Sequence, residues 1–355
     1  MTSLAERTQE KPVPIPQPTP SPTPLNVTAY TGGENVSSAR FRVRQYVGPL
    51  ARFGVRLDER WPALTSYPPR AKFLRPAWFA ATLAQRLAQV TAARSSDAVL
   101  FQKELVSTLP TLEGLVRRPC VVDIDDSIHL FRDGWAAKRL ASVADIVIVG
   151  NEWLAEVWGQ WSQAVEVLPT AIDTERHALS PMPHSPVIGW IGLGSNLHYL
   201  TAIAPALARV VERFPDTVIA VCSDRKPDLP DLPVSYVPWS AEAEAPFLSS
   251  ISIGVMPLAD GLWERGKCAF KMLQYMSCGR PCVVSPAFMN AQILREADVG
   301  LSAVTCNEWT EALCSLLSDR DAARKMGEAG RKLAVENYSV DVLAPRFAAQ
   351  LRRLV

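Results

Sequence analysis

Short runs of β-branched and other apolar residues alternate with amphipathic segments along this chain, and this alternation constrains its fold more than any other feature. In the first half, apolar runs lie at 25–30, 97–102, 119–125, 144–150 and 164–170, and helical patterns lie at 77–94, 134–142 and 151–160. Apolar runs that alternate with helices are typical of a parallel sheet with helices on both faces. The first half is therefore expected to form a doubly wound α/β domain.

A second series of the same kind follows residues 177–186, a stretch with three prolines and no apolar periodicity. Its apolar runs lie at 186–194, 217–223, 233–239, 251–258 and 282–286, and its helical patterns at 197–213, 267–278, 307–317, 319–336 and 339–353. At 355 residues the chain is longer than one core usually supports. Two domains joined by this linker are expected, with a ligand in the cleft between them.

The N-terminal region, residues 1–24, is expected to be a disordered tail. Every second residue from Pro12 to Pro24 is proline, which removes backbone donors and favours extended polyproline II structure. The N-terminus lacks the apolar core of a signal peptide, and no run of about twenty apolar residues occurs. These features predict a cytoplasmic protein that is at most peripheral at the inner face of a membrane.

The cysteines indicate a reducing compartment. There are seven of them, most lie inside apolar runs, and none forms a CxxC pair. Buried thiols are expected, with neither a zinc site nor a disulfide framework.

The charge of the chain is distributed unevenly. The window 40–94 holds eleven Lys or Arg against only Asp58 and Glu59, although the whole chain carries a net charge of +1. Such a window suits an anionic partner such as a diphosphate or an acidic membrane surface, and equally a solvated surface. A nucleic-acid partner is not expected, because the whole protein is close to neutral.

The stretch WERGKCAFKMLQYMSCGRPCVVSP, residues 263–286, has the pattern of a phosphate-binding loop that leads into a helix. Lys267, Lys271 and Gln274 recur at spacings of four and three, so they can share one helical face. Gly279 and Pro281 are expected to end that helix before a buried strand.

Several blocks of the chain follow one another in a characteristic order. They are the GG after the first apolar run, SSARFRVRQYVGPLARFGV, ADIVIVGNEWLAEVW, VEVLPTAIDTERH, GWIGLGSNLHYL, PLADGLWERGKCAFKMLQYMSCGRPCVVS and RKMGEAGRKLAVENYSVDVLAPRF. In this order, over residues 25–353, the chain resembles the retaining nucleotide-sugar glycosyltransferases of the GT-B fold, specifically family 4, which builds polysaccharides, glycolipids and glycosides.

The resemblance implies an α/β fold of two Rossmann-like domains that face a central cleft. An acceptor-binding domain would span 25–180, and a nucleotide-sugar-binding domain would span 186–336. A C-terminal helix within 337–355 would cross back to pack on the first domain.

The resemblance also assigns a donor site. The leaving diphosphate of a UDP- or GDP-sugar would be neutralised by cations and a helix N-terminus, without a metal or other cofactor. Gln274 falls where the family places the second glutamate of its motif, which binds the donor ribose. The other donor-binding candidates are Gly33, Gly194, Ser195, Arg265, Lys267 and Lys271.

Three acidic residues are the candidates for a catalytic role. Asp125 and Asp126 end a predicted strand, and Asp125 stands where the family commonly has a histidine. Either carboxylate could orient an acceptor hydroxyl or accept its proton. Glu264 is the acid nearest to the first motif glutamate, whose strict position is Gly266. The alternative for DIDD is a DxD metal site, which we disfavour because the phosphate-type loop lies in the second half.

On the acceptor side, Arg40 and Arg42 are candidates to bind a lipid diphosphate or an acidic sugar. The predicted partners are a nucleotide-sugar and a glycan or lipid-linked acceptor. Aromatic residues interleaved with the cations of 40–94 predict a peripheral membrane contact, although core packing explains them as well.

The predicted function is metal-independent, retaining transfer of a sugar from a nucleotide-sugar to a hydroxyl acceptor. The alternative is a catalytically inactive GT-B protein that binds nucleotide-sugars as a partner subunit or sensor. A GT-B epimerase or phosphorylase is a third, weaker reading.

Overall fold

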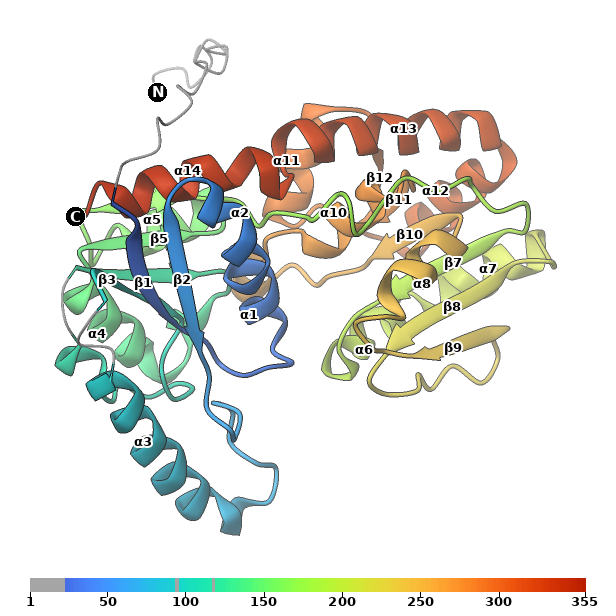
Figure 1. The fold of residues 1–355 in the computed structure, drawn as a ribbon. Coiled ribbons are helices and arrows are strands. Elements are labelled where there is room, and N and C mark those ends of the chain that lie inside the picture. The colour runs from blue at the N-terminus through green and yellow to red at the C-terminus, as the bar shows by residue number, and fades with distance from the viewer. Residues whose placement is uncertain (1–22, 93–95, 117–118) are drawn as a thin grey trace, which may run out of the picture.

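The structure is a computed structural model that describes residues 23–92, 96–116 and 119–355. Most of the predicted N-terminal tail lies outside these residues. Two six-stranded sheets, in which every pair of neighbouring strands is parallel, form the two halves of the molecule (Figure 1). The two α/β series predicted from the alternation of apolar runs and helices are confirmed.

The first sheet has the strand order β2-β1-β3-β4-β5-β6. Its strands are β1 (Leu25–Tyr30), β2 (Val55–Arg60), β3 (Ala98–Gln102), β4 (Cys120–Ile124), β5 (Ile146–Val149) and β6 (Val165–Val167). The helices of this half are α1 (Ser37–Arg42), α2 (Val47–Arg52), α3 (Arg75–Ala92), α4 (Trp135–Val143) and α5 (Glu152–Trp158). Sequence analysis missed β2, because this edge strand carries four charged residues and reads as polar.

The second sheet has the order β12-β11-β10-β7-β8-β9. Its strands are β7 (Val187–Ile191), β8 (Val218–Ser223), β9 (Val234–Pro238), β10 (Ile253–Met256), β11 (Cys282–Val284) and β12 (Gly300–Ser302). Its helices are α6 (Leu197–Ala202), α7 (Ala204–Arg213), α8 (Glu244–Ser250), α9 (Leu262–Arg265), α10 (Phe270–Ser277), α11 (Phe288–Glu296), α12 (Cys306–Ser318) and α13 (Arg320–Asn337).

Two predicted helices differ from the observed ones. The helix expected over 197–213 is broken at Ile203, where the next helix begins with Pro205 in its first turn. The helix expected over 267–278 begins only at Phe270, because Ala269 has a left-handed backbone with φ of 53°. Lys267 therefore lies in the loop before α10, whereas Lys271 and Gln274 lie on the helix.

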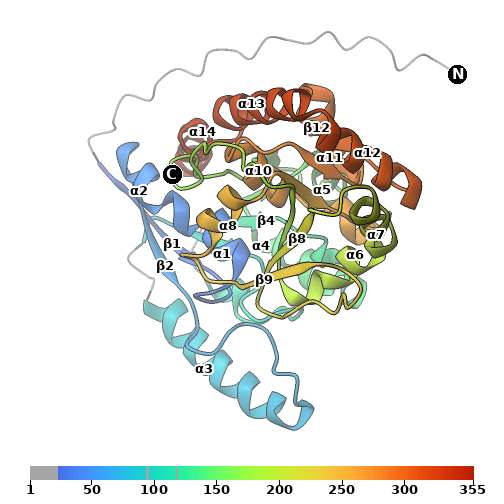
Figure 2. The same ribbon diagram turned by 90° about the vertical axis from the view of Figure 1, so that its right-hand side faces the viewer.

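The last helix, α14 (Val340–Arg352), runs back over the first half of the molecule (Figures 1 and 2). Leu343 and Phe347 are fully buried in the core of the first sheet. The ring of Phe347 meets that of Tyr46 edge to face, with centroids 5.1 Å apart. The expected C-terminal crossing helix is confirmed.

The strand order of each sheet reverses once, and these reversals locate the binding site. In the first sheet the reversal lies between β1 and β3, and in the second it lies between β7 and β10. Ligands of open α/β sheets bind outside the carboxyl ends of the strands at such a point. A cavity of about 420 Å³ lies there, lined by Lys103 after β3, Gly192 after β7 and Met256 of β10.

Candidate active site

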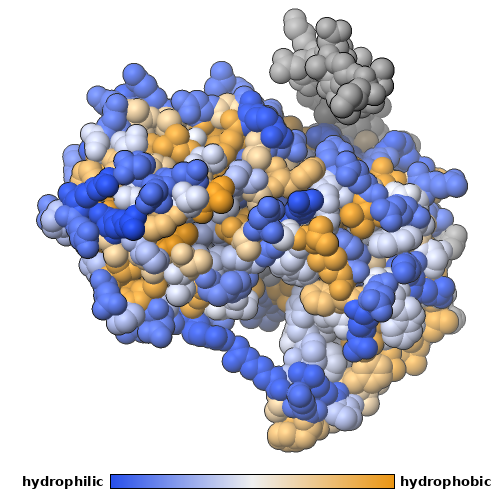
Figure 3. Space-filling view, turned by 180° about the vertical axis from the view of Figure 1, so that it is seen from behind, coloured by the Kyte–Doolittle hydropathy of each residue, from blue (hydrophilic) through white to orange (hydrophobic). Residues whose placement is uncertain are grey.

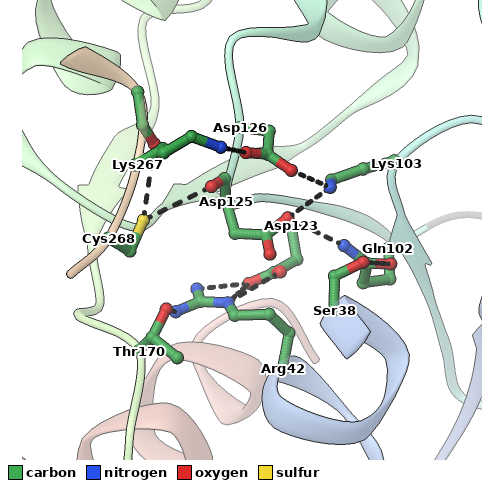
Figure 4. Close-up of polar contacts among 11 residues, drawn as sticks. Ser38, Arg42, Gln102, Lys103, Asp123, Asp125, Asp126, Thr170, Lys267 and Cys268 are labelled. Atoms are coloured by element: carbon green, nitrogen blue, oxygen red, sulfur yellow. Dashed lines mark hydrogen bonds and ion pairs between the residues drawn. The ribbon is translucent and has the colours of Figure 1, made fainter. Parts of the chain in front are cut away.

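Asp126 of the first half faces Lys267 of the second half across this cavity (Figure 4), which Asp125 and Lys271 also line. The Lys103 Nζ lies 2.8 Å from an Asp125 oxygen and 2.7 Å from an Asp126 oxygen. The other oxygen of Asp126 lies 4.0 Å from the Lys267 Nζ. The cavity thus holds a line of alternating charges, in which Asp126 separates two ammonium groups.

The protonation states of this cluster follow from its pairing. Burial by itself would raise the pKa of Asp126, but the nearby ammonium groups of Lys103 and Lys267 outweigh it and lower that pKa. Burial would likewise lower the pKa of Lys103, yet the two aspartates hold it well above its usual value. Asp126 is therefore an ionised carboxylate and Lys103 is an ammonium at neutral pH.

Sequence analysis missed Lys103. This residue directly follows β3 and has a left-handed backbone with φ of 62°, which turns the chain sharply at the carboxyl end of the strand. Its ammonium lies between the carboxylates of Asp125 and Asp126, the last two residues of the DIDD motif. Its position in the sequence could have identified it, because a lysine directly after a buried strand can lie at the carboxyl edge of the sheet, where ligands bind.

The loop that carries Lys267 is held by the first half of the molecule. The Asn151 Nδ2 donates to the backbone oxygens of Arg265, at 3.1 Å, and Lys267, at 3.2 Å. The Ser127 Oγ donates to the backbone oxygens of Leu262, at 3.0 Å, and Trp263, at 3.1 Å. These contacts hold α9 and the start of the following loop by their backbone oxygens, while the Lys267 side chain lines the cavity.

Two glycines permit this close approach. A Cβ atom at Gly266 would lie 2.2 Å from the Ser127 Oγ, and one at Gly150 would lie 2.1 Å from the Cys268 Sγ. Real Cβ atoms do not come so close to other atoms. Gly266 is the position where the resemblance predicted the first motif glutamate, and its packing against Ser127 leaves no room for a side chain there.

Lys271 lies on the first turn of α10, where it lines the cavity. Burial, together with the neighbouring charge of Lys267, lowers the pKa of Lys271 to about 8, although Asp126 opposes the shift. Its side chain approaches Gly192 so closely that a Cβ there would lie 2.7 Å from the Lys271 Cε. An anion in the cavity would find two ammonium groups and the start of a helix together.

Gln274 lies one turn further along α10 and forms part of a buried polar group. Its Nε2 donates to a Glu244 oxygen at 2.7 Å. The other Glu244 oxygen accepts from the Arg40 Nη2, also at 2.7 Å, so this ion pair joins the two halves of the molecule. All three residues line the cavity. Sequence analysis missed Glu244, because α8 was not predicted at all.

Four of the predicted donor residues do not line this cavity. Gly33 is buried in the turn after β1, where its oxygen accepts from Val36. The Gly194 N–H donates to Asp224 at 2.5 Å, so it is already paired, and Ser195 is exposed. The Arg265 side chain is about half exposed and faces Asp260 at 4.0 Å.

The side chain of Glu264 turns away from the cavity. It is buried and accepts a hydrogen bond from the Tyr199 hydroxyl of α6. Glu264 does not line the cavity in this conformation.

Of the two predicted acceptor-binding arginines, Arg42 does not line the cavity. Arg42 is 1% exposed, and its Nη2 lies 2.6 Å from an Asp123 oxygen. Its Nη1 donates to the Leu168 oxygen at 2.7 Å. Arg42 and Asp123 therefore form an ion pair inside the first domain, whereas Arg40, two residues earlier, reaches the cavity.

This pairing also weakens the DxD alternative. Asp123 is bound by Arg42, and the Lys103 ammonium lies between Asp125 and Asp126, where a bridging cation would have to sit. Within the described ranges, no group of three His, Cys, Asp or Glu side chains is arranged to hold a metal ion.

Comparisons with known proteins show what this chain is similar to. Residues 185–319 match the family model of glycosyl transferases group 1. The chain is 25% identical over 310 residues to the GDP-mannose-dependent alpha-(1-6)-phosphatidylinositol monomannoside mannosyltransferase of Mycolicibacterium smegmatis, covering 76% of this chain and 80% of that protein.

Two solved structures share the fold over 93% of this chain. One is HepE of Anabaena in complex with UDP and glucose, with a TM-score of 0.69 and 13% identity over 100% of that chain. The other is a sucrose-phosphate synthase of Thermosynechococcus elongatus, with a TM-score of 0.70 and 16% identity over 99% of that chain.

Proposed function

We propose, on the premise that this chain is a group 1 glycosyltransferase of the GT-B fold that uses a nucleotide-sugar donor, that it transfers the sugar with retention and without a metal. The acceptor is a hydroxyl group of a glycan or of a lipid-linked saccharide. The observation that carries this proposal is the pair Lys267 and Lys271, which face an ionised Asp126 inside the cavity between the two sheets.

The two lysines receive the donor diphosphate in this mechanism. Negative charge grows on the diphosphate as the glycosidic bond breaks, and fixed cations in a partly dry cavity stabilise it. Lys267 comes from a loop fastened by Asn151, and Lys271 comes from the first turn of α10. Because protein ammonium groups neutralise the diphosphate, the transfer needs no divalent cation.

The aspartates orient the acceptor hydroxyl from the opposite side. Asp125 and Asp126 come from the first domain, residues 25–180, which we assign to acceptor binding, and the lysines come from the donor domain, residues 186–336. Lys103 fixes both carboxylates in place. Front-face attack requires the hydroxyl beside the leaving phosphate, which then takes its proton. Glu264 contacts the sugar only if its side chain rotates away from Tyr199.

A lipid-linked acceptor is supported by the name of one relative and by the basic region 40–94 of the first domain. The relative from Mycolicibacterium smegmatis bears the name of an enzyme that acts on a phosphatidylinositol mannoside. No helix in the described part of this chain is long and apolar enough to cross a bilayer. We propose that the protein reaches its acceptor by peripheral contact through the basic region 40–94, at the cytoplasmic face of the membrane.

The experiment begins with a thermal-shift screen against UDP-, GDP-, ADP- and TDP-sugars, because a ligand that binds only the folded state raises the melting temperature. The donor that binds is then offered with mannosylated phosphatidylinositol and with soluble oligosaccharides, and nucleotide release and the anomeric configuration of the product are measured. Release with a retained anomer supports the proposal. Donor binding without release on any acceptor would contradict it and favour an inactive sensor.

A further inference from the structure

The buried group around Glu244 has no task in the transfer step described above. The Glu244 side chain is 3% exposed, yet it lines the cavity, and both its oxygens already accept hydrogen bonds, from Arg40 and from Gln274. A carboxylate has about four acceptor positions, so it can accept further hydrogen bonds from a ligand. A buried carboxylate whose cationic partner belongs to the other domain is costly whenever the domains separate.

Gln274, the hydrogen-bond partner of Glu244, places this buried group next to Lys271 along α10. Lys271 and Gln274 are three residues apart on one face of the helix, about one turn or 5 Å along its axis. If the diphosphate lies at Lys271, the next unit along this face is either the ribose or the transferred sugar. The ring of Trp239, which shares the partner Arg40 with Glu244, favours the ribose and its base on this side. The vicinal hydroxyls of a ribose are donors, and a carboxylate is the strongest acceptor that a protein offers them.

The surroundings of Glu244 also suit a nucleoside. Trp239 lines the same cavity and offers an aromatic face, over which the Arg40 guanidinium lies 5.1 Å from the ring centroid. Phe41 of the first domain meets Phe270 of the second with ring centroids 3.6 Å apart, so apolar contacts close the cavity beside the ion pair. Arg40 and Phe41 thus cover from the first domain the part of the cavity next to the diphosphate.

We propose that Glu244 is the residue that reads the ribose hydroxyls of the donor, held in place by Gln274 and covered by Arg40 when the domains are closed. Helix α10 presents an amide, that of Gln274, at this point of the cavity. The carboxylate comes instead from Glu244 of α8. This inference rests on the proposed function, since it assumes a nucleotide diphosphate at Lys267 and Lys271. It assigns to Arg40 a positioning role at the donor instead of direct contact with the acceptor.

The test measures discrimination between sugars of the nucleotide. Calorimetric titration uses UDP or GDP, whichever binds the wild-type protein more tightly, together with the 2′-deoxy and 3′-deoxy forms of that diphosphate. Hydrogen bonds to a carboxylate predict that the wild-type protein binds the ribonucleotide about tenfold more tightly than at least one deoxy form. In Glu244→Gln, this ratio is expected to fall to about threefold or less.

Two further variants separate ribose recognition from a structural role. Arg40→Lys keeps a cation beside the carboxylate and should keep the wild-type ratio even if overall affinity falls. Glu242→Ala removes an exposed glutamate two residues away and should change neither ratio nor affinity. Thermal unfolding of each variant shows that it folds, and Arg40→Lys tests the inference even where Glu244→Gln does not fold.

The outcomes are distinct. In Glu244→Gln, the affinities for the ribonucleotide and the deoxynucleotides could fall by the same factor. That result would overturn the inference and leave Glu244 with only a structural role in the ion pair between the domains. A ratio lost in Arg40→Lys would also overturn it. A wild-type protein that binds none of the diphosphates would overturn the proposed function together with this inference, whereas tight binding with an unchanged ratio would overturn the inference alone.

Discussion

At the scale of single residues, the cavity distinguishes cations that face a ligand from cations that serve the fold. Lys267 and Lys271 line it, whereas Arg42 is paired inside the first domain and Arg265 faces outward. The sequence pattern assigned three of them to the donor and Arg42 to the acceptor, because it records charge and spacing but not the direction of a side chain. The direction depends on where α10 begins, and a left-handed Ala269 sets that start.

Lys267→Ala is expected to lower kcat/KM for transfer by about 100-fold, because it removes a charged contact that strengthens as the diphosphate departs. Arg265→Ala, two residues away, is expected to lower it by less than about threefold, because that side chain is about half exposed beside Asp260. Steady-state kinetics of both variants check this prediction. Equal losses in the two variants would remove Lys267 from its assigned role.

Lys271 gives the donor site a pH dependence. Its pKa of about 8 in the free protein rises when a diphosphate binds, so binding takes up protons near that pH. Above about pH 7, where the terminal phosphate of the nucleotide is already ionised, affinity for UDP or GDP is therefore expected to fall as the pH rises through 8. Titrations from pH 7 to about 9, between the ionisation of the terminal phosphate and that of the base, test this, and Lys271→Met should abolish the decline. An affinity that rises with pH over this range would contradict the assignment.

At the scale of elements, the loop from α9 to α10 is the part of the site that sequence reasoning described least well. The pattern indicated a phosphate-binding loop before a helix, which the structure has. It did not indicate that two side chains of the other domain bind backbone oxygens here, Ser127 those of α9 and Asn151 those of Arg265 and Lys267. Contacts between segments more than a hundred residues apart leave no local periodicity, so a single sequence does not reveal them.

Asn151 has two tasks that one substitution can separate. Its Oδ1 accepts from the Leu154 N–H at the start of α5, and its Nδ2 donates to the loop. Asn151→Ser keeps an N-terminal cap but does not reach the loop, so stability should change by less than about 1 kcal/mol. Transfer is expected to slow by about tenfold, because Lys267 loses its support. Thermal unfolding and kinetics are the measurements. An unchanged transfer rate would show that the position of Lys267 does not depend on the Asn151 hydrogen bonds.

At the scale of the whole molecule, the chain crosses between the domains twice, and the two crossings lie side by side. The Ile172 N–H donates to the Tyr338 oxygen at 2.8 Å, and the Val340 N–H donates to the Ile172 oxygen at 3.1 Å. The sequence predicted both sheets and the returning helix, because the period of the apolar residues indicates which segments are strands and which are helices packed on them. It did not predict the Arg40 and Glu244 pair, because this contact exists only once the two domains meet.

One part of the first domain projects from the body of the molecule. Helix α3 extends away from the sheet (Figures 1 and 2), and apolar residues gather on this projection when it is seen from behind (Figure 3). Phe73, just before α3, is 82% exposed, and Arg70, Lys72 and Arg75 around it are exposed as well. The cations of 40–94 therefore divide into exposed ones here and paired ones, such as Arg42, inside the domain.

This projection is expected to carry the membrane contact. The protein should sediment with vesicles of phosphatidylcholine and phosphatidylglycerol but not with phosphatidylcholine alone, and salt should release it. Phe73→Ser should lower the bound fraction severalfold, because an inserted aromatic ring is lost. Val304→Ser removes a comparably exposed apolar side chain from the other domain and should have no effect. Equal binding by all three proteins would contradict the assignment.

The most direct test of the central claim compares nucleoside diphosphate with monophosphate by calorimetric titration. If Lys267 and Lys271 receive the terminal phosphate, the wild-type protein binds UDP or GDP at least about tenfold more tightly than UMP or GMP. Lys267→Ala then loses most of that difference while its affinity for the monophosphate barely changes. A Lys267→Ala protein that keeps the full preference for the diphosphate would contradict the claim.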